Sequence, residues 1–356
     1  MRVGLMAENP LERGVIASGI VPAAMLEAYA PVYARAITAA TRLGIFDALS
    51  AGARSATAVA ATCGTDQRAT EKLLNLLVTM KYVGYRGGTY ALARHARRWL
   101  LTDAPGGIRD LILMKELEWR WIDRLESFAK DGRPLDVHGT MSSDDWGAYQ
   151  RGMRAQANLL ASWLARRLPM PAGARTLLDV GGSHGYFSVV LCRRYPDLSA
   201  TVLDLPPAVE HAAPLLEREG MGERVALRAG DALVDDLGEA AYDVILMFSL
   251  VHHFDDATNR LLMRRAAGAL RPGGYLVIGD ALRPPSPGKG GQQGAFFDLY
   301  FALTSRSGLW TFEEMRSWQV DAGLVPRKPI ALVPGGGFAL QIAEREAARF
   351  SPGQPG

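Results

Sequence analysis

The sequence predicts an α/β fold of Rossmann-like type, with a mostly parallel sheet preceded by a smaller helical region. The first observation is a rhythm of short apolar runs separated by helix-length segments in the second half of the chain. Such runs are typical of parallel strands covered on both faces by helices. The second observation is helical periodicity over most of residues 22–168. The predicted strands cover residues 176–182, 199–205, 224–231, 242–250 and 273–280.

The end of the chain departs from this rhythm. Residues 323–333 and 336–345 are apolar stretches separated by Pro334 and by glycines. A proline and glycines between two strand-like stretches indicate a hairpin. We therefore expect an antiparallel C-terminal strand at the edge of the sheet.

The first hundred residues predict a winged-helix arrangement. Residues 22–49 are apolar on all faces of a predicted helix, so this helix requires a partner. Residues 55–101 follow as a helix, a turn, a second helix from Asp66 to Met80, and a short hairpin through Gly87 and Gly88. This pattern is common in DNA-binding domains.

The second of these helices argues against DNA binding. It offers only Arg68 and Lys72, with Glu71 between them, and is otherwise rich in Leu, Val and Met. A recognition helix needs more basic residues to contact phosphates. We therefore expect a dimerisation role and a homodimer, with no nucleic acid as partner.

Two domains are predicted. Residues 1–105 form the helical winged-helix-like domain, and residues 106–356 form the larger domain, with a helical lead-in over 106–170 and a sheet core over 175–345. The lead-in predicts helices over 108–130 and 144–168 that are rich in Trp. Two prolines and a glycine within residues 168–174 end the helical pattern.

Charge and cysteine usage favour a small-molecule partner and the cytoplasm. The chain has 40 Lys and Arg against 37 Asp and Glu, with no run of five or six basic residues. Cys63 and Cys192 are too few for a disulfide framework and lack metal-ligand spacing. No uninterrupted apolar stretch approaches the roughly 18 residues that a membrane span needs, and the N-terminus is charged too often for a secretory signal.

A glycine-rich turn follows the first predicted strand. Residues 179–188 read DVGGSHGYFS and lead into a helix, so a ligand can approach the backbone there. A dinucleotide fingerprint fails, because Ser183 and Tyr186 stand where G-x-G-x-x-G counted from Gly181 needs glycines. No Gly-Lys-Ser/Thr follows either, which excludes a phosphate-binding P-loop.

Acidic residues follow the next two predicted strands. Asp204 ends the second strand, where an acid in such sheets hydrogen-bonds a ribose. Asp231 ends the third, where it could accept a hydrogen bond from an exocyclic amine while Ala232 and Leu233 cover a ring. Asp179, Asp204 and Asp231 together suit a ligand with an ammonium, a ribose and an adenine, although each alone could cap a helix or turn.

With these motifs in view, residues 25 to 345 resemble the S-adenosylmethionine-dependent O-methyltransferases of small phenolic and secondary metabolites. The likeness rests on DVGGSHGYFS, LDLP, GDAL, HHFDD, LRPGGYLVIGD and GGFALQIAE, and on the winged-helix segment before them. It implies a methyltransferase sheet, a homodimer with intertwined N-terminal helices and S-adenosylmethionine as cofactor. Many family members carry Lys where this chain has Phe248, so a contact from that side chain would be apolar. The residues assigned to cofactor binding are Asp179, Gly181, Gly182, Gly185, Asp204, Leu205, Asp231, Ala232 and Phe248.

The resemblance also assigns the catalytic groups. Methyl transfer is an in-line displacement, so it needs alignment and removal of the acceptor's proton. The family's base maps to His252 and the acid that supports it to Asp280, while His253 falls where many members have Asp. Adjacent side chains point in different directions, so we expect only one of the two histidines in the cleft. A second acid of plant members is absent, because residues 308–311 read GLWT.

Three other interpretations of the histidine pair and the pocket stay open. The pair could be a polar strand end in an enzyme that acts by proximity, or a metal site with Asp256. We assign no metal, because adjacent histidines chelate poorly. Arg151 and Arg154 could bind a carboxylate of the substrate. The predicted pocket residues are Trp119, Trp146, Tyr149, Met153, His252, Phe297 and Tyr300, with Trp121, Phe301 and Trp310 as further aromatic candidates.

The leading hypothesis is an O-methyltransferase of a small hydroxylated metabolite. The first alternative is C- or S-methylation of a small keto acid or thioether acid, with or without a metal. The second is a winged-helix regulator that binds the cofactor as a signal without reacting.

Overall fold

The computed structural model describes residues 9–20, 22–305, 307–332 and 337–347. Residues 1–8, in the N-terminus that we judged too charged for a secretory signal, lie outside this range. Residues 333–336, in the predicted hairpin turn, also lie outside it. The chain divides into two compact units, Met1–Glu116 and Leu117–Gly356, and the division falls within one helix. Each unit is described by itself.

The N-terminal unit contains the predicted winged-helix arrangement. The single helix expected over 22–49 is wrong, because the chain breaks at Gly44, which has a left-handed φ of 74° that favours glycine. Gly87 and Gly88 also have positive φ, as a two-residue hairpin turn requires. The elements are α1 (Pro10–Ala17), α2 (Ala23–Glu27), α3 (Ala30–Arg42), α4 (Ile45–Ala48), α5 (Ala56–Cys63), α6 (Gln67–Thr79), β1 (Val83–Arg86), β2 (Thr89–Leu92) and α7 (Arg94–Trp99).

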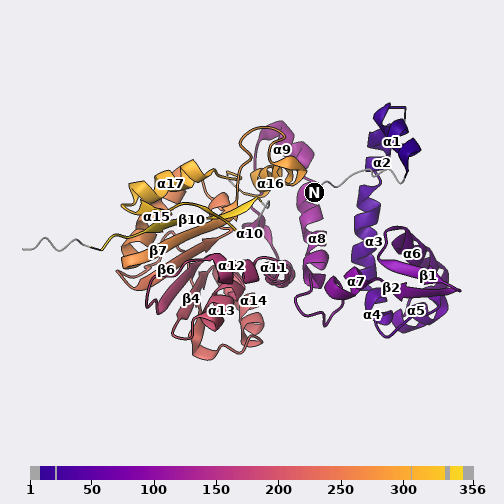
Figure 1. Ribbon diagram of the computed structural model, residues 1–356, viewed down its shortest axis with the longest axis horizontal. Helices are drawn as coiled ribbons and strands as arrows, with labels where there is room; N and C mark the ends of the chain where they lie inside the picture. Colours follow the sequence, from indigo (N-terminus) through magenta and orange to yellow (C-terminus); the bar gives the residue numbers. More distant parts are fainter. Residues whose placement is uncertain (1–8, 21, 306, 333–336, 348–356) are drawn as a thin grey trace, which may run out of the picture. The chain divides into compact units, whose positions relative to one another are not determined.

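The C-terminal unit is built on one mixed sheet (Figure 1). Its strand order is β5-β4-β3-β6-β7-β10-β8, with β9 also paired to β10. The first five strands of this order are parallel, and β10 runs antiparallel to β7. The expected antiparallel strand is present, but it does not lie at the edge, because β8 and β9 pair with its outer side. The strands are β3 (Thr176–Val180), β4 (Ser199–Asp204), β5 (Val225–Ala229), β6 (Tyr242–Phe248), β7 (Leu270–Ala281), β8 (Val325–Pro326), β9 (Ile330–Ala331) and β10 (Phe338–Glu344).

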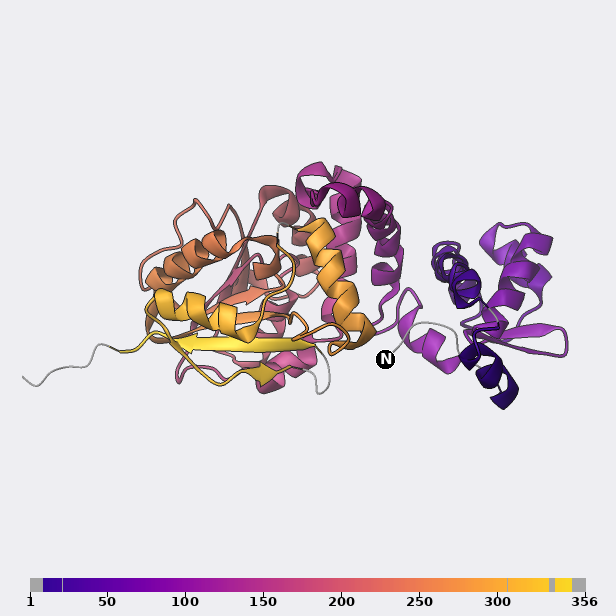
Figure 2. The same cartoon turned by 90° about the horizontal axis from the view of Figure 1, so that it is seen from above.

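Alternating side chains of the central strands bury both faces of this sheet. On β6, Val244 and Leu246 point into one core, and Ile245 and Met247 point into the other. Helices α12, α13 and α14 cover the first face, and α15 and α17 cover the second (Figure 1). Figure 2 shows α17 beside β10 from a second direction. The covering helices are α12 (Ala161–Arg167), α13 (Tyr186–Arg194), α14 (Pro206–Glu217), α15 (Asp256–Ala269) and α17 (Phe312–Asp321).

The remaining helices precede the sheet along the chain or connect its strands. Each of the two long helices expected over 108–130 and 144–168 is interrupted once. Helix α11 begins with a capping box between Ser142 and Asp145. The elements are α8 (Arg109–Ile122), α9 (Leu125–Asp131), α10 (Val137–Thr140), α11 (Ser143–Ala157) and, after the sheet has begun, η1 (Gly222–Arg224), η2 (Val251–His253) and α16 (Gly291–Thr304). Within the described ranges, no helix is both long and apolar enough to cross a membrane.

Candidate active site

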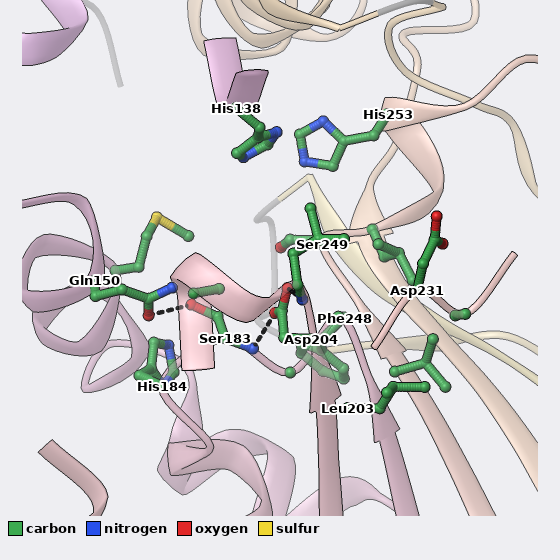
Figure 3. A pocket seen from close by; sticks show the side chains of 18 of the residues that line it. His138, Gln150, Ser183, His184, Leu203, Asp204, Asp231, Phe248, Ser249 and His253 are labelled. Atoms are coloured by element: carbon green, nitrogen blue, oxygen red, sulfur yellow. Dashed lines mark hydrogen bonds between the residues drawn. The ribbon is translucent and has the colours of Figure 1, made fainter. Parts of the chain in front are cut away.

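A cavity of about 250 Å³ opens at the carboxyl ends of β3, β4 and β6 (Figure 3). The chain leaves β3 toward β4 on one side and returns to β6 on the other, so this is the switch point where such sheets bind ligands. Part of the lining comes from the loops after these strands, and another part from α10 and α11. The predicted residues that line it are Gly181, Gly182, Asp204, Leu205, Asp231, Ala232, Phe248, Trp146, Tyr149 and Met153.

The glycine turn after β3 has no room for side chains. Gly181 has a φ of 64°, and a Cβ there would lie 2.7 Å from Leu250 Cδ1. A Cβ on Gly182 would lie 2.6 Å from Cγ of Asp179. The backbone of this turn therefore faces the cavity directly, as close approach of a ligand requires.

Asp204 is held in place by the same turn. Ser183 N and Leu205 N each donate a hydrogen bond of 2.7 Å to its carboxylate. Burial raises the pKa of Asp204, while these two backbone bonds act in the opposite direction. Ser183 Oγ donates to Gln150 Oε1 at 2.7 Å, which links the turn to α11 (Figure 3). Asp204 is therefore fixed at the cavity wall, where it can accept bonds from a diol.

Two of the residues assigned to the cofactor, Asp179 and Gly185, do not line the cavity. Asp179 is fully buried beneath Gly182 and accepts a bond of 2.7 Å from Ser188 Oγ. Its other oxygen, Oδ1, is buried without a partner. Burial raises the pKa of Asp179 to about 7. This side chain therefore supports the glycine turn from below.

We expect Asp179→Asn to stabilise the protein more at pH 8 than at pH 5. The raised pKa means that the folded state holds a proton between about pH 4 and 7 that the unfolded state releases, so stability falls as pH rises across this range. Asparagine does not titrate and avoids this loss, which is on the order of 2 kcal/mol over two pH units. Thermal unfolding of both proteins at the two pH values measures the difference. If the difference in Tm between Asp179→Asn and wild type did not change with pH, the raised pKa of Asp179 would be contradicted.

Asp231 and Phe248 also line the cavity. Asp231 accepts a bond of 2.9 Å from Leu233 N, which orders the loop after β5. The Phe248 ring packs on Phe187 with centroids 4.6 Å apart. A Cβ on Gly279 would lie 2.4 Å from that ring, so glycine is required behind it. The part of the wall that Phe248 forms is therefore apolar, at the position where many family members carry Lys.

His252 and Asp280 form a buried pair at the ends of the neighbouring strands β6 and β7. His252 Nδ1 lies 2.9 Å from both carboxylate oxygens of Asp280, so the shorter acid reaches the ring. A carboxylate only accepts, so Nδ1 carries a proton and Nε2 of the neutral ring is left with a lone pair. The pair is 2% exposed at each residue.

Three side chains, one from α15 and two from the connection between α16 and α17, hold the η2 turn that carries His252. Trp310 Nε1 donates to the Val251 carbonyl at 3.0 Å. Asn259 Nδ2 donates to the same carbonyl and to that of Phe254. Ser307 Oγ donates to the Phe254 carbonyl at 2.6 Å. Trp310 stands in the GLWT segment, where plant members carry the second acid. Its indole holds the η2 turn through the Val251 carbonyl, whereas that acid would support the imidazole.

His253, and not His252, lines the cavity. The His252 ring is covered by Phe301, with ring centroids 3.8 Å apart. His253 lies 4.8 Å from His138 of α10, centroid to centroid, and the two rings lie next to one another edge to face (Figure 3). The rings of His252 and His253 lie 4.3 Å apart, centroid to centroid, so the two side chains do not point in opposite directions. Of the pair, the residue that lines the cavity is the one to which we gave no role.

The aromatic residues divide between the cavity and the core. Trp119, Phe297 and Tyr300 do not line the cavity. Tyr300 packs with Trp121 in a small core beside α10, and Trp310 packs edge-on against Trp318. Helical periodicity alone does not separate these positions from Trp146, Tyr149 and Met153, which do line it.

Neither arginine of α11 reaches the cavity. Arg154 bonds Glu219 and Asn158 and lies over the ring of Tyr186, while Arg151 is exposed. Asp256, the third member of the metal hypothesis, pairs with Arg260 and accepts a bond from Trp318. Among the described residues, no group of three or more His, Cys, Asp or Glu side chains could hold a metal ion.

Several polar lining residues were not predicted. His138, Gln150, His184 and Ser249 line the cavity from different segments. Burial, and then the nearby Arg154, lower the pKa of His184 to about 3, so this ring is neutral. His184 stands inside the DVGGSHGYFS motif and Ser249 inside the predicted strand over 242–250, but neither position by itself indicated a side chain in the cavity.

Comparison with known proteins decides the family. Residues 132–320 match the family model of the O-methyltransferase domain, and residues 28–102 match that of the O-methyltransferase dimerisation domain. The chain belongs to the O-methyltransferase family. It is an S-adenosylmethionine-dependent O-methyltransferase, so neither C- or S-methylation nor a non-catalytic regulator is needed to explain the cavity.

Individual relatives agree with this assignment. The chain is 27% identical to 3-hydroxy-5-methyl-1-naphthoate 3-O-methyltransferase of Streptomyces sahachiroi, over 81% of this chain and 84% of the relative. It is 29% identical to mitomycin biosynthesis 6-O-methyltransferase of Streptomyces lavendulae, over 71% of this chain and 75% of the relative. The structure of human N-acetylserotonin methyltransferase in complex with S-adenosylmethionine has the same fold, with a TM-score of 0.81 and 19% identity over 96% of this chain and all of that one.

The residues present fit this cofactor. The glycine turn leaves the backbone open to a ligand, and Asp204 and Asp231 lie at the tips of adjacent strands. S-adenosylmethionine carries an ammonium, a ribose and an adenine, which need such acceptors. None of the cavity-lining residues of the described chain is Lys or Arg, so nothing there repels a sulfonium.

Proposed function

We propose that the enzyme methylates a hydroxyl group of a small aromatic acceptor, with His252 as the general base. The observation that carries the base assignment is the contact between His252 Nδ1 and both oxygens of Asp280 at 2.9 Å. Asp280 fixes the ring in the tautomer whose Nε2 can accept a proton and stabilises the imidazolium that forms. We assign the ribose to Asp204, the adenine to Asp231 and Ala232, and the methionine part to the turn at Gly181.

The cofactor supplies the methyl group as a sulfonium. His252 takes the acceptor's hydroxyl proton as the acceptor oxygen forms its bond to the methyl carbon, and the electron pair of the broken carbon–sulfur bond stays on sulfur. The products are a methyl ether, S-adenosylhomocysteine and protonated His252 beside Asp280. Phe301 covers the His252 ring, and His252 does not line the cavity. The Phe301 side chain therefore has to move before the acceptor hydroxyl can reach His252 Nε2.

The walls of the cavity support an aromatic acceptor. Trp146, Tyr149 and Met153 line it from α11, and flat apolar faces stack on aromatic rings. One relative is named for a hydroxylated naphthoate and another for the mitomycin pathway. We therefore propose that the acceptor comes from secondary metabolism and contains an aromatic ring, either single or fused.

The test is methyl transfer from methyl-labelled S-adenosylmethionine to a panel of phenols, naphthols, hydroxyquinones, keto acids and thioethers. We expect label in the phenolic or naphtholic products, as methyl ethers. Transfer only to keto acids or thioethers would contradict the proposal. Turnover of His252→Ala on the best acceptor then tests the base.

We propose that the dimerisation domain forms a homodimer, in the cytoplasm, where Cys63 and Cys192 stay as free thiols. Met25, Tyr29, Val32 and Tyr33 expose between 43% and 55% of their surface in the single chain. We expect light scattering to give twice the chain mass of 38.5 kDa. Val32→Glu combined with Tyr33→Glu is expected to lower the mass toward one chain, because charges would have to be buried. A wild-type monomer would contradict the proposal.

A further inference from the structure

His253 has one ring nitrogen engaged and one left over. Its Nδ1 lies 2.9 Å from Ser305 Oγ, which fixes the ring at the C-terminal end of α16. No hydrogen bond of Nε2 is seen within the described ranges, and the same holds for both ring nitrogens of His138. Both residues line the cavity. Because both rings are half-buried and line the cavity, these nitrogens are open to a hydrogen bond with a ligand group.

Both imidazoles are held neutral. Burial, and then the neighbouring His252 ring, lower the pKa of His138 to about 4. Burial, followed by the His252 and His138 rings, lowers the pKa of His253 well below its ordinary value. The rings are also surrounded by aromatic groups, since His138 stacks on Trp146 with centroids 5.5 Å apart. A neutral imidazole donates one hydrogen bond through one ring nitrogen and accepts one through the other, but it cannot neutralise an anion.

The charges around these rings point the same way. The charged residues that line the cavity are Asp204 and Asp231, and no Lys or Arg lines it within the described chain. The two arginines considered for a carboxylate, Arg151 and Arg154, do not line it either. A carboxylate of the acceptor would therefore lose its hydration without gaining a cation. An uncharged oxygen would lose less hydration free energy on entering the cavity and would gain a hydrogen bond from one of these imidazoles.

We propose that His253, with His138 beside it, is a specificity-determining residue that hydrogen-bonds a second, uncharged oxygen of the acceptor. The enzyme thereby selects neutral aromatic acceptors with two oxygen substituents over aromatic carboxylates. The inference rests on the proposed function, in that the acceptor occupies the α10–α11 end of the cavity. It assigns no proton transfer to His253.

Two variants separate the two nitrogens of His253. His253→Asn places an amide near the Nδ1 position and keeps a partner for Ser305, but it removes the group at Nε2. His253→Gln reaches toward the Nε2 position. The acceptor probes are 2,3-dihydroxynaphthalene, 2-naphthol and 3-hydroxy-2-naphthoate, which differ only at the second substituent. Calorimetry with S-adenosylhomocysteine present measures acceptor binding independently of turnover, and KM and kcat are measured on each probe that reacts.

We expect wild-type enzyme to bind the dihydroxy probe about tenfold more tightly than 2-naphthol, as one hydrogen bond would give, and the carboxylate most weakly. His253→Asn should weaken binding of the dihydroxy probe about tenfold and leave binding of 2-naphthol unchanged. His253→Gln should recover most of the affinity for the dihydroxy probe. The change should appear in KM, with kcat within about threefold. Affinity for S-adenosylmethionine should be unchanged in both variants.

Three results would overturn the inference. One is a wild-type enzyme that prefers the carboxylate or binds none of the probes. Another is an equal loss on both neutral probes in both variants, which would indicate a packing role for the ring. The third is a loss in kcat alone. Binding with the expected order but without methyl transfer to any hydroxyl would leave this inference standing and contradict the proposed reaction.

Discussion

His252→Ala is expected to lower kcat by about 10²-fold or more while the affinity for S-adenosylmethionine stays unchanged. The reason is that proton removal by a positioned base contributes 10²- to 10⁴-fold, and Nε2 of His252 is the only lone pair that the Asp280 contact prepares for this task. Steady-state kinetics on the best acceptor, with cofactor binding by calorimetry, measure both quantities. Unchanged kcat would show that the enzyme works by proximity alone.

Asp280→Asn provides the matched comparison. Asparagine keeps an acceptor for Nδ1–H, so the ring orientation can be retained, but it removes the charge that stabilises the imidazolium. We expect kcat to fall about tenfold or more, by less than in His252→Ala, and the double variant to lose little beyond His252→Ala, because the two residues act as a unit. Fully additive losses would contradict the pairing.

The sheet could be predicted because its strands bury both faces. Strands such as β6 are uninterruptedly apolar after Asp243, and the helix-length segments between them predict a parallel arrangement. The pairing of His252 with Asp280, 28 residues apart, was implied by the family resemblance. The structure accounts for it, because the ends of the neighbouring parallel strands β6 and β7 meet at one edge. The place of β10 inside the sheet was missed, since β8 and β9 are too short to be recognised as separate strands.

The orientation of the histidine pair could not be predicted. His252 and His253 lie in a 3₁₀ turn, where the alternation of a strand does not apply, and Asn259, Ser307 and Trp310 fix its direction. The residues at the α10–α11 end of the cavity could not be predicted from the sequence either. His138 comes from a helix of four residues whose position depends on tertiary packing.

Gly181→Ala is expected to weaken S-adenosylmethionine binding by about ten- to a hundredfold. The added Cβ would lie 2.7 Å from Leu250 Cδ1, at a residue whose φ is 64°. A left-handed conformation costs a non-glycine residue about 1–2 kcal/mol, and crowding of a packed site costs about 1–3 kcal/mol, so the turn must shift out of the shape that faces the cofactor. Each 1.4 kcal/mol of this cost that weakens the free energy of cofactor binding lowers the affinity tenfold.

Gly173→Ala separates the two causes. Gly173 has a comparable φ of 71° in the loop before β3, but a Cβ there meets nothing within 4 Å. This variant should lose stability from backbone strain and keep its cofactor affinity, whereas Gly181→Ala should lose affinity whether or not its Tm changes. Cofactor affinity equal to wild type in Gly181→Ala would place the cofactor elsewhere. Because His252→Ala changes kcat alone and Gly181→Ala changes cofactor affinity, the two variants together test whether proton removal and cofactor binding belong to separate parts of the site.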